Sequence, residues 1–89
     1  MDEILIFGEL VKDIRLRKGL SQEKLAEKTS LDRTFISLIE TGKSSPTLLT
    51  ILKISGAFGL APSELMLEFE KRLGEAEENK PEKTPGGKV

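Results

Sequence analysis

The sequence predicts an all-α fold, a compact bundle of five short helices joined by turns. Apolar residues recur at helical spacing along most of the chain, and no segment shows the alternation expected of a strand. Glycine and serine–proline sites separate the helical stretches from one another. The length of 89 residues corresponds to one domain with a modest core.

The apolar spacing places the helices in order. The predicted ranges are Leu5–Lys18, Gln22–Thr29, Arg33–Thr41, Pro46–Phe58 and Pro62–Leu73. Proline is well placed at the first position of a helix, which sets the start of the last two. The side chains expected to face the core are Phe7, Leu10, Val11, Ile14, Leu25, Ala26, Ile36, Ile39, Leu48, Ile51, Leu52, Ile54, Phe58, Leu65, Met66, Phe69 and Leu73.

Glycines and capping residues mark the predicted helix ends. Gly19, Gly42 and Gly59 suit the left-handed conformation that ends many helices. Ser21 and Asp32 stand where a side-chain oxygen would cap the second and third helices.

The composition changes at Gly74, after which the chain is rich in glycine, proline and charge. Such a segment buries too little apolar surface to offset the entropy of ordering. Residues 1–73 are therefore predicted to form the domain and residues 74–89 a disordered polar tail, in which Glu75–Glu78 could extend the last helix by a turn.

Composition excludes several classes of function. The sequence has no Cys and no His, which rules out disulfides, Cys/His zinc sites and Ser–His–Asp triads. No apolar run approaches the length of a membrane span, and the acidic start does not resemble a secretory signal. We expect a cytoplasmic protein that is not an enzyme and needs no cofactor, metal or small-molecule ligand.

The charge is unevenly distributed although the net charge is only −1. Residues 12–53 carry nine basic and five acidic side chains, so the middle of the chain is positive and both ends are acidic. Local field matters more than total charge for a surface that meets phosphate. This distribution favours a nucleic-acid partner.

Residues 22–39 have the spacing of a helix-turn-helix. A short helix, a tight turn and a second short helix occupy this segment, and Ala26 is small enough to let the two helices cross closely. Leu25, Leu31, Ile36 and Ile39 are placed to hold the crossing.

This segment and its flanks resemble the Cro/repressor-type helix-turn-helix regulators. The matching strings are Arg15-x3-Gly19-Leu20-Ser21-Gln22-Glu23-x-Leu25-Ala26, Ile36-Ser37-x-Ile39-Glu40-x-Gly42 and Pro46-x-Leu48-x-Thr50-Ile51. The resemblance covers about residues 7–70. It implies a five-helix DNA-binding module that acts as a homodimer on a palindromic operator.

The resemblance also implies which residues meet DNA, and the predicted helix geometry agrees for three of them. Arg33, Thr34 and Ser37 lie on the outward face of the third helix, whose N-terminal part would enter the major groove. Arg33 is the candidate for a bidentate contact to guanine. The full expected set is Gln22, Arg33, Thr34, Ser37, Lys43, Ser44 and Arg17.

Gln22 is expected to bind phosphate and to brace the recognition helix, and Lys43 and Ser44 are expected to reach the phosphate backbone. Arg17 either reaches phosphate or simply favours the dipole of the first helix. Gln22, like Arg33, Thr34 and Ser37, could instead be an ordinary solvated residue.

Arg15 and Glu40 match positions that usually form an ion pair between the first and third helices, and we assign them a structural role. Two residues depart from the family pattern. Ser30 stands where glycine is common in the turn, and a positive φ at this serine would cost about 1 kcal/mol of strain. Gly56 lies inside the fourth helix, which it should weaken by about 1 kcal/mol relative to alanine.

A homodimer is expected to form through the fourth and fifth helices. The candidate interface residues are Leu49, Leu60, Leu67 and Phe69, although a small bundle exposes some leucine in any case. A dimer would hold two recognition helices about 34 Å apart, matching adjacent major grooves.

The favoured function is a sequence-specific transcriptional regulator. The run Leu31–Ser37 is similar to controller proteins of restriction–modification systems, and small prophage-type repressors look alike. An antitoxin that binds a toxin and autoregulates its own operon is the alternative. The expected partners are double-stranded DNA and a second copy of the chain, with RNA polymerase as a further candidate.

Overall fold

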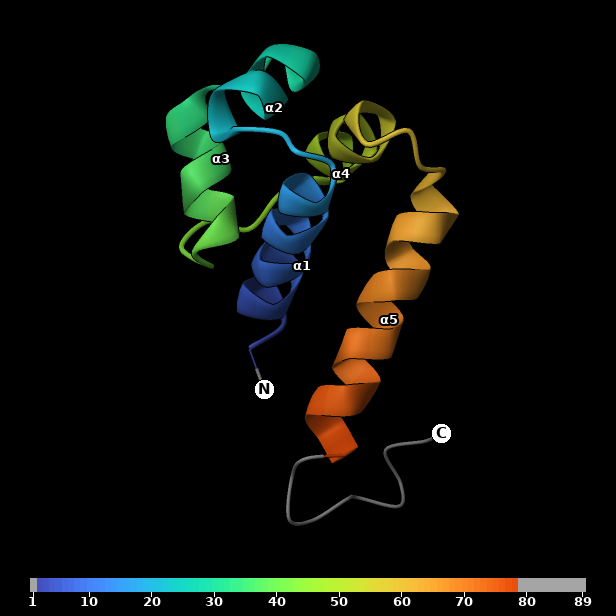
Figure 1. Ribbon diagram of the computed structural model, residues 1–89. Coiled ribbons are helices and arrows are strands. Elements are labelled where there is room, and N and C mark those ends of the chain that lie inside the picture. The colour runs from blue at the N-terminus through green and yellow to red at the C-terminus, as the bar shows by residue number, and fades with distance from the viewer. Residues whose placement is uncertain (1, 79–89) are drawn as a thin grey trace.

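The protein folds as five α-helices, seen in a computed structural model that describes residues 2–78 (Figure 1). The helices are α1 (Glu3–Arg17), α2 (Gln22–Thr29), α3 (Arg33–Glu40), α4 (Leu48–Ala57) and α5 (Pro62–Glu78). No strand occurs within residues 2–78. The predicted all-α class and the number of helices are confirmed.

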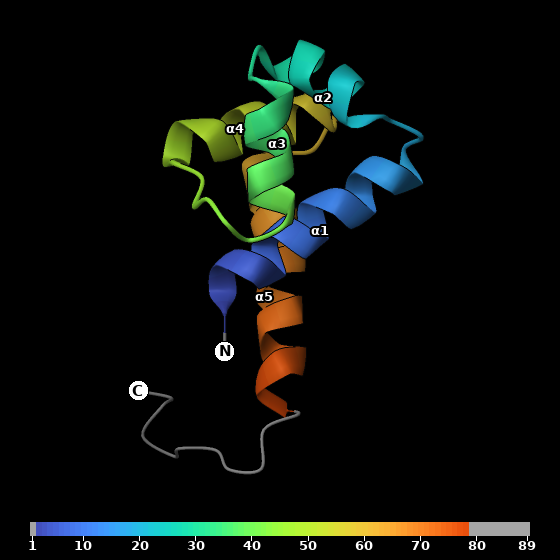
Figure 2. The same ribbon diagram turned by 90° about the vertical axis from the view of Figure 1, so that its left-hand side faces the viewer.

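The helices pack around α1, which contacts α3 on one side and α5 on the other. Helix α2 crosses α3, and α4 bridges α2 and α5. Figures 1 and 2 show α2 and α3 together at one end of the molecule, with α5 extending past the other helices at the opposite end. The buried core is formed by Phe7, Leu10, Val11, Ile14, Leu25, Ala26, Ile36, Ile39, Ile54, Phe58 and Leu65.

Side-chain caps set the starts of α1, α2 and α4. Asp2 accepts a hydrogen bond from the backbone N–H of Leu5, so α1 begins two residues before the predicted start. Ser21 caps α2 as predicted, through the N–H of Lys24 at 3.0 Å. Asp32 occupies the cap position of α3, but its side chain makes no capping hydrogen bond, so that prediction was only half right.

Helix α4 begins at Leu48, two residues later than predicted. Thr47 is the N-cap, and its hydroxyl accepts from the N–H of Thr50 at 3.1 Å. A threonine hydroxyl can satisfy a free N–H at the helix start, which proline does not do. Pro46 therefore precedes the cap and is not the first helical residue.

The buried face of α4 also differs from the prediction. Leu48 and Leu52, expected in the core, are 73% and 43% exposed. Thr50 and Ser55 are buried instead, in the same helical stripe as Ile54. The hydroxyls of this stripe are satisfied locally, because Thr50 bonds the Thr47 hydroxyl and Ser55 donates to the Leu52 carbonyl.

The sequence of α4 contains two stripes at helical spacing, one formed by residues 50, 51, 54, 55 and 58 and the other by residues 48, 49 and 52. Periodicity alone does not show which of the two stripes is buried. Packing against α2 and α5 buries the first stripe and leaves the second, which is all leucine, in contact with solvent.

Gly8 lies where α1 approaches α3 most closely. A Cβ atom placed on Gly8 would stand 2.0 Å from the carbonyl oxygen of Ile39 and 3.0 Å from that of Glu40. Any side chain at position 8 would thus collide with the backbone at the C-terminal end of α3. The relative placement of these two helices depends on a residue without a side chain.

Helix α5 continues to Glu78, which confirms the one-turn extension considered for Glu75–Glu78 and places the predicted domain boundary after Leu73 inside a helix. Two contacts hold α5 against α1: an ion pair between Arg72 and Asp13 at 2.8 Å, and an edge-to-face contact of Phe69 with Phe7. The rest of the predicted tail, residues 79–89, lies outside the described residues.

No single helix within residues 2–78 is long and apolar enough to cross a membrane. Taken together, α4 and α5 reach that length and composition, but only across a bend of 104°.

Candidate nucleic-acid interface

A tight turn sets the angle between α2 and α3. Ser30 has φ +60°, the left-handed conformation, and the N–H of Leu31 donates to the carbonyl of Ala26 at 3.1 Å. The turn therefore has the positive φ that suits the glycine common at this position in the family. Because the residue here is a serine, the backbone carries a strain of about 1 kcal/mol. Ala26 is buried at the crossing, as predicted.

Helix α3 buries one face and presents the other to solvent. Ile36 and Ile39 are fully buried, whereas Arg33 and Thr34 are exposed and Ser37 is half-buried. The N-terminal half of α3 is thus the accessible part of the helix. This is the orientation that was predicted for a recognition helix.

Beneath α3 lies a buried ion pair that ties α1 to the end of α3. The Nε of Arg15 donates to Glu40 Oε2 at 2.6 Å and its Nη2 donates to Glu40 Oε1 at 3.1 Å. The third nitrogen, Nη1, donates to the carbonyl of Leu20 at 2.8 Å, in the segment between α1 and α2. The Arg15 and Glu40 side chains are only 8% and 2% exposed, and their predicted pairing is confirmed.

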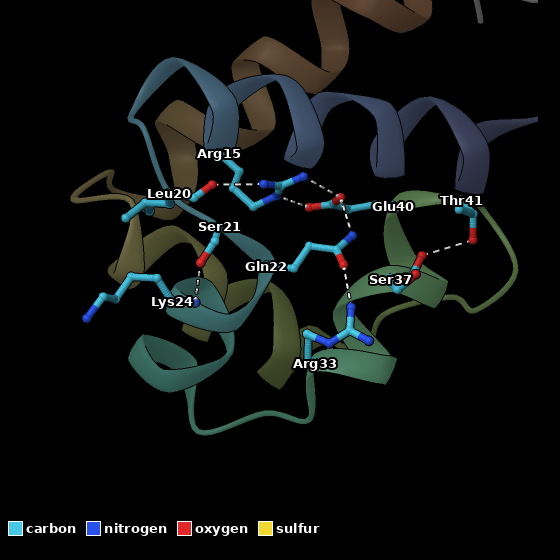
Figure 3. A network of polar contacts seen from close by, with 9 residues as sticks. All are labelled: Arg15, Leu20, Ser21, Gln22, Lys24, Arg33, Ser37, Glu40 and Thr41. Atoms are coloured by element: carbon cyan, nitrogen blue, oxygen red, sulfur yellow. Dashed lines mark hydrogen bonds and ion pairs between the residues drawn. The ribbon is translucent and has the colours of Figure 1, made fainter.

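Gln22 joins this ion pair to the exposed face of α3 (Figure 3). Its Nε2 donates to Glu40 Oε1 at 3.0 Å, and its Oε1 accepts from Nη1 of Arg33 at 3.0 Å. Gln22 is half-buried, and it braces α3 as expected. The contact between Gln22 and Arg33 was not predicted, although both are the first residues of helices that cross.

The loop after α3 is held by backbone contacts. Gly42 has φ +75°, and a Cβ there would lie 2.9 Å from the Cα of Leu5, so this loop sits against the start of α1. The N–H groups of Lys43 and Ser44 both donate to the carbonyl of Leu38, at 2.9 and 3.2 Å. Lys43 is exposed and Ser44 is half-buried, beside the C-terminal end of α3.

Arg17 is exposed but belongs to a different part of the surface. It follows Arg15 by two residues, which places it on the opposite side of α1 from the ion pair. Together with Lys18 it lines a hollow whose other wall includes Glu64 and Glu68 of α5. The structure therefore does not bring Arg17 together with Arg33, and its alternative role at the end of α1 fits this position.

The four predicted dimer residues divide into two pairs. Leu49 and Leu67 are 61% and 51% exposed. Leu60 and Phe69 are half-buried and pack against the core of their own chain. Leu48 and Leu52, which were missed as surface residues, extend the apolar surface around Leu49.

Comparison with known proteins agrees with this geometry. The model of a family described as helix-turn-helix matches residues 11–65, more than half of the chain. The chain is 47% identical over 77 residues to the control protein C.BamHI of Bacillus amyloliquefaciens, covering 85% of this chain and 93% of that protein.

Two solved structures are similar to the fold. The restriction–modification controller protein C.AhdI from Aeromonas hydrophila has 37% sequence identity and a TM-score of 0.70, covering 73% of this chain and 98% of that one. The controller protein C.Esp1396I, solved as a tetramer with its natural 35 base-pair operator, has 30% identity and a TM-score of 0.75 over 81% of this chain and 95% of that one. All three relatives are named as control or controller proteins, not as enzymes. This protein therefore belongs to the helix-turn-helix family.

Proposed function

We propose that this protein is a sequence-specific DNA-binding transcriptional regulator that acts in the cytoplasm as a homodimer on a palindromic operator. The observation that carries the proposal is the exposed N-terminal half of α3, with Arg33 and Thr34 facing solvent above a buried, fully bonded support. Among regulators, the likeness to C.BamHI and C.AhdI favours a controller protein of a restriction–modification system.

In this proposal, the exposed half of α3 enters the major groove. Arg33 donates to the acceptors of a guanine edge, while Thr34 and Ser37 contact neighbouring bases. Lys43 and Ser44, held in the loop after α3, contact the phosphate backbone and set the position of the helix. Bases are thus read by α3, and the loop supplies affinity that is independent of sequence.

A homodimer accounts for the exposed leucines of α4. Leu48, Leu49 and Leu52 form one contiguous helical stripe that residues 2–78 leave exposed. We name these three residues the α4 leucine patch. A second copy of the chain, related by a two-fold axis, would cover the patch and present a second α3 to the next major groove.

The experiment that tests the function is selection of binding sites from random duplex DNA, with the complex sized in solution. We expect a palindromic consensus and two chains for each site. Failure to enrich any sequence at low salt would overturn the proposal. Copurification with a small basic protein in place of DNA would favour the antitoxin alternative.

Arg33→Ala and Lys43→Ala should weaken binding in different ways. Arg33→Ala should cost about 1–3 kcal/mol of discrimination at one operator position, because it removes a base contact. Lys43→Ala should weaken binding to all duplexes alike and make the salt dependence shallower by about one unit of slope. Titration of matched and single-base-changed operators at several salt concentrations separates these outcomes; a base-selective loss in Lys43→Ala would contradict its assignment.

Leu49→Glu should weaken self-association by about 2 kcal/mol or more, because it places a charge within the α4 leucine patch. Analytical ultracentrifugation across a range of protein concentrations measures the effect. Leu16→Glu is the matched control, since Leu16 is 56% exposed but lies on α1, outside the patch. Equal effects of the two variants would exclude the patch as the interface.

A further inference from the structure

We propose that Glu40 is a positioning residue for base readout, acting through Gln22 to hold the guanidinium of Arg33 in place. This inference rests on the proposed function, in which Arg33 reads DNA. It gives the buried ion pair a role in specificity as well as in stability. The three residues form a chain of contacts from the buried end of α3 to its exposed beginning, as Figure 3 shows.

The polarity of the groups allows only one arrangement of this chain. An ionised carboxylate can only accept hydrogen bonds, and a guanidinium can only donate them. The amide of Gln22 lies between Glu40 and Arg33, so it bonds both partners only when its NH2 faces Glu40 and its oxygen faces Arg33. The carboxylate thereby dictates the direction in which the amide oxygen points.

The carboxylate is itself held rigidly. The Glu40 side chain is 2% exposed, and both of its oxygens accept from Arg15. Arg15 is anchored a third time at the carbonyl of Leu20. A rotation of the Glu40 carboxylate would break several of these bonds together, so Gln22 is bonded to a fixed point.

The fixed position of Gln22 in turn restricts Arg33, whose side chain is otherwise exposed. One N–H of Nη1 is bonded to Gln22, which restricts the guanidinium, and no group within residues 2–78 bonds its other N–H groups, which can therefore meet a base edge. A long side chain that is ordered before binding loses less entropy on binding. The anchor should improve specific binding roughly two- to tenfold.

A double-mutant cycle separates this role from a direct contact of Gln22 with phosphate. Gln22→Met keeps the length of the side chain but removes both hydrogen bonds. If Gln22 acts through Arg33, Gln22→Met should reduce discrimination at the base read by Arg33 roughly two- to tenfold, and should have no further effect in an Arg33→Ala background. An equal loss on all duplexes, unchanged by Arg33→Ala, would overturn the proposal in favour of a phosphate contact.

A second measurement needs no DNA, so it distinguishes failure of this inference from failure of the proposed function. NMR relaxation of the arginine Nε–H groups reports their order in the free protein, and the chain has only four arginines and one glutamine to assign. We expect Arg33 to be more ordered than exposed Arg17. In Gln22→Met its order should fall to the level of Arg17, while buried Arg15 keeps its order.

Glu40→Gln tests the first link of the chain. A glutamine at position 40 offers both a donor and an acceptor, so the Gln22 amide would no longer be forced into one orientation. We expect Arg33 to lose order in this variant, with folding checked by thermal melting. If Glu40→Gln does not fold, rotation of the Gln22 NH2 group in the unaltered protein serves instead. Rotation as fast as that of a free glutamine amide would overturn the proposal.

Discussion

Gly8→Ala should destabilise the protein by about 3 kcal/mol or more, although alanine is the better helix former. The added Cβ would lie 2.0 Å from the carbonyl oxygen of Ile39, and that oxygen belongs to the backbone of α3. Relief requires α1 and α3 to move apart, which opens the core between them. For a domain of this size, the expected loss corresponds to a fall in melting temperature of roughly 12–24 °C.

Gly56→Ala is the matched control. Gly56 also lies inside a helix, but a Cβ there would meet nothing within 4 Å. This substitution should raise the free energy of unfolding by about 1 kcal/mol, because glycine is a poor helix former. Thermal and urea unfolding of the two variants measure both effects. A Gly8→Ala variant as stable as the unaltered chain would show that α1 and α3 do not depend on this close approach.

Removing either partner of the buried ion pair should have an effect on stability at least as large. Glu40→Ala leaves the Arg15 guanidinium buried without its carboxylate, and Arg15→Met leaves the carboxylate without its cation. An uncompensated buried charge of this kind costs about 3–5 kcal/mol. Chemical denaturation of each variant should show this loss.

The double variant should be less destabilised than the sum of the two single variants, because it leaves no charge unpaired. The exposed pair of Lys24 and Glu27 provides the contrast, with side chains 56% and 71% exposed. Lys24→Ala should change the free energy of unfolding by less than about 1 kcal/mol. Additive losses at Arg15 and Glu40 would show that the two residues stabilise the fold independently.

Local signals in the sequence predicted much of this fold. The bounds of α2 agree with the prediction at both ends, because Ser21 caps its start and the left-handed Ser30 follows its end. The buried faces of α1 and α3 were predicted from apolar spacing, and the Arg15–Glu40 pair from the family resemblance. Each of these signals is carried by a residue type at a fixed spacing along the chain.

The incorrect predictions arose where the local sequence supported two interpretations equally well. Pro46 and Thr47 both suit a helix start, and the hydroxyl of Thr47 determined the result. Helix α4 offers two stripes at helical spacing, and the more apolar one is the one exposed. The link from Gln22 to Glu40 joins residues 18 positions apart, so no local pattern could reveal it.

By itself, the sequence determined the number of helices, most of their bounds to within one residue and the outward face of α3, because helical periodicity and capping depend on residues a few positions apart. The tertiary structure decided which stripe of α4 is buried, how closely α1 approaches α3 and where the amide of Gln22 points. Those features depend on how distant helices pack and on which donors and acceptors that packing brings together.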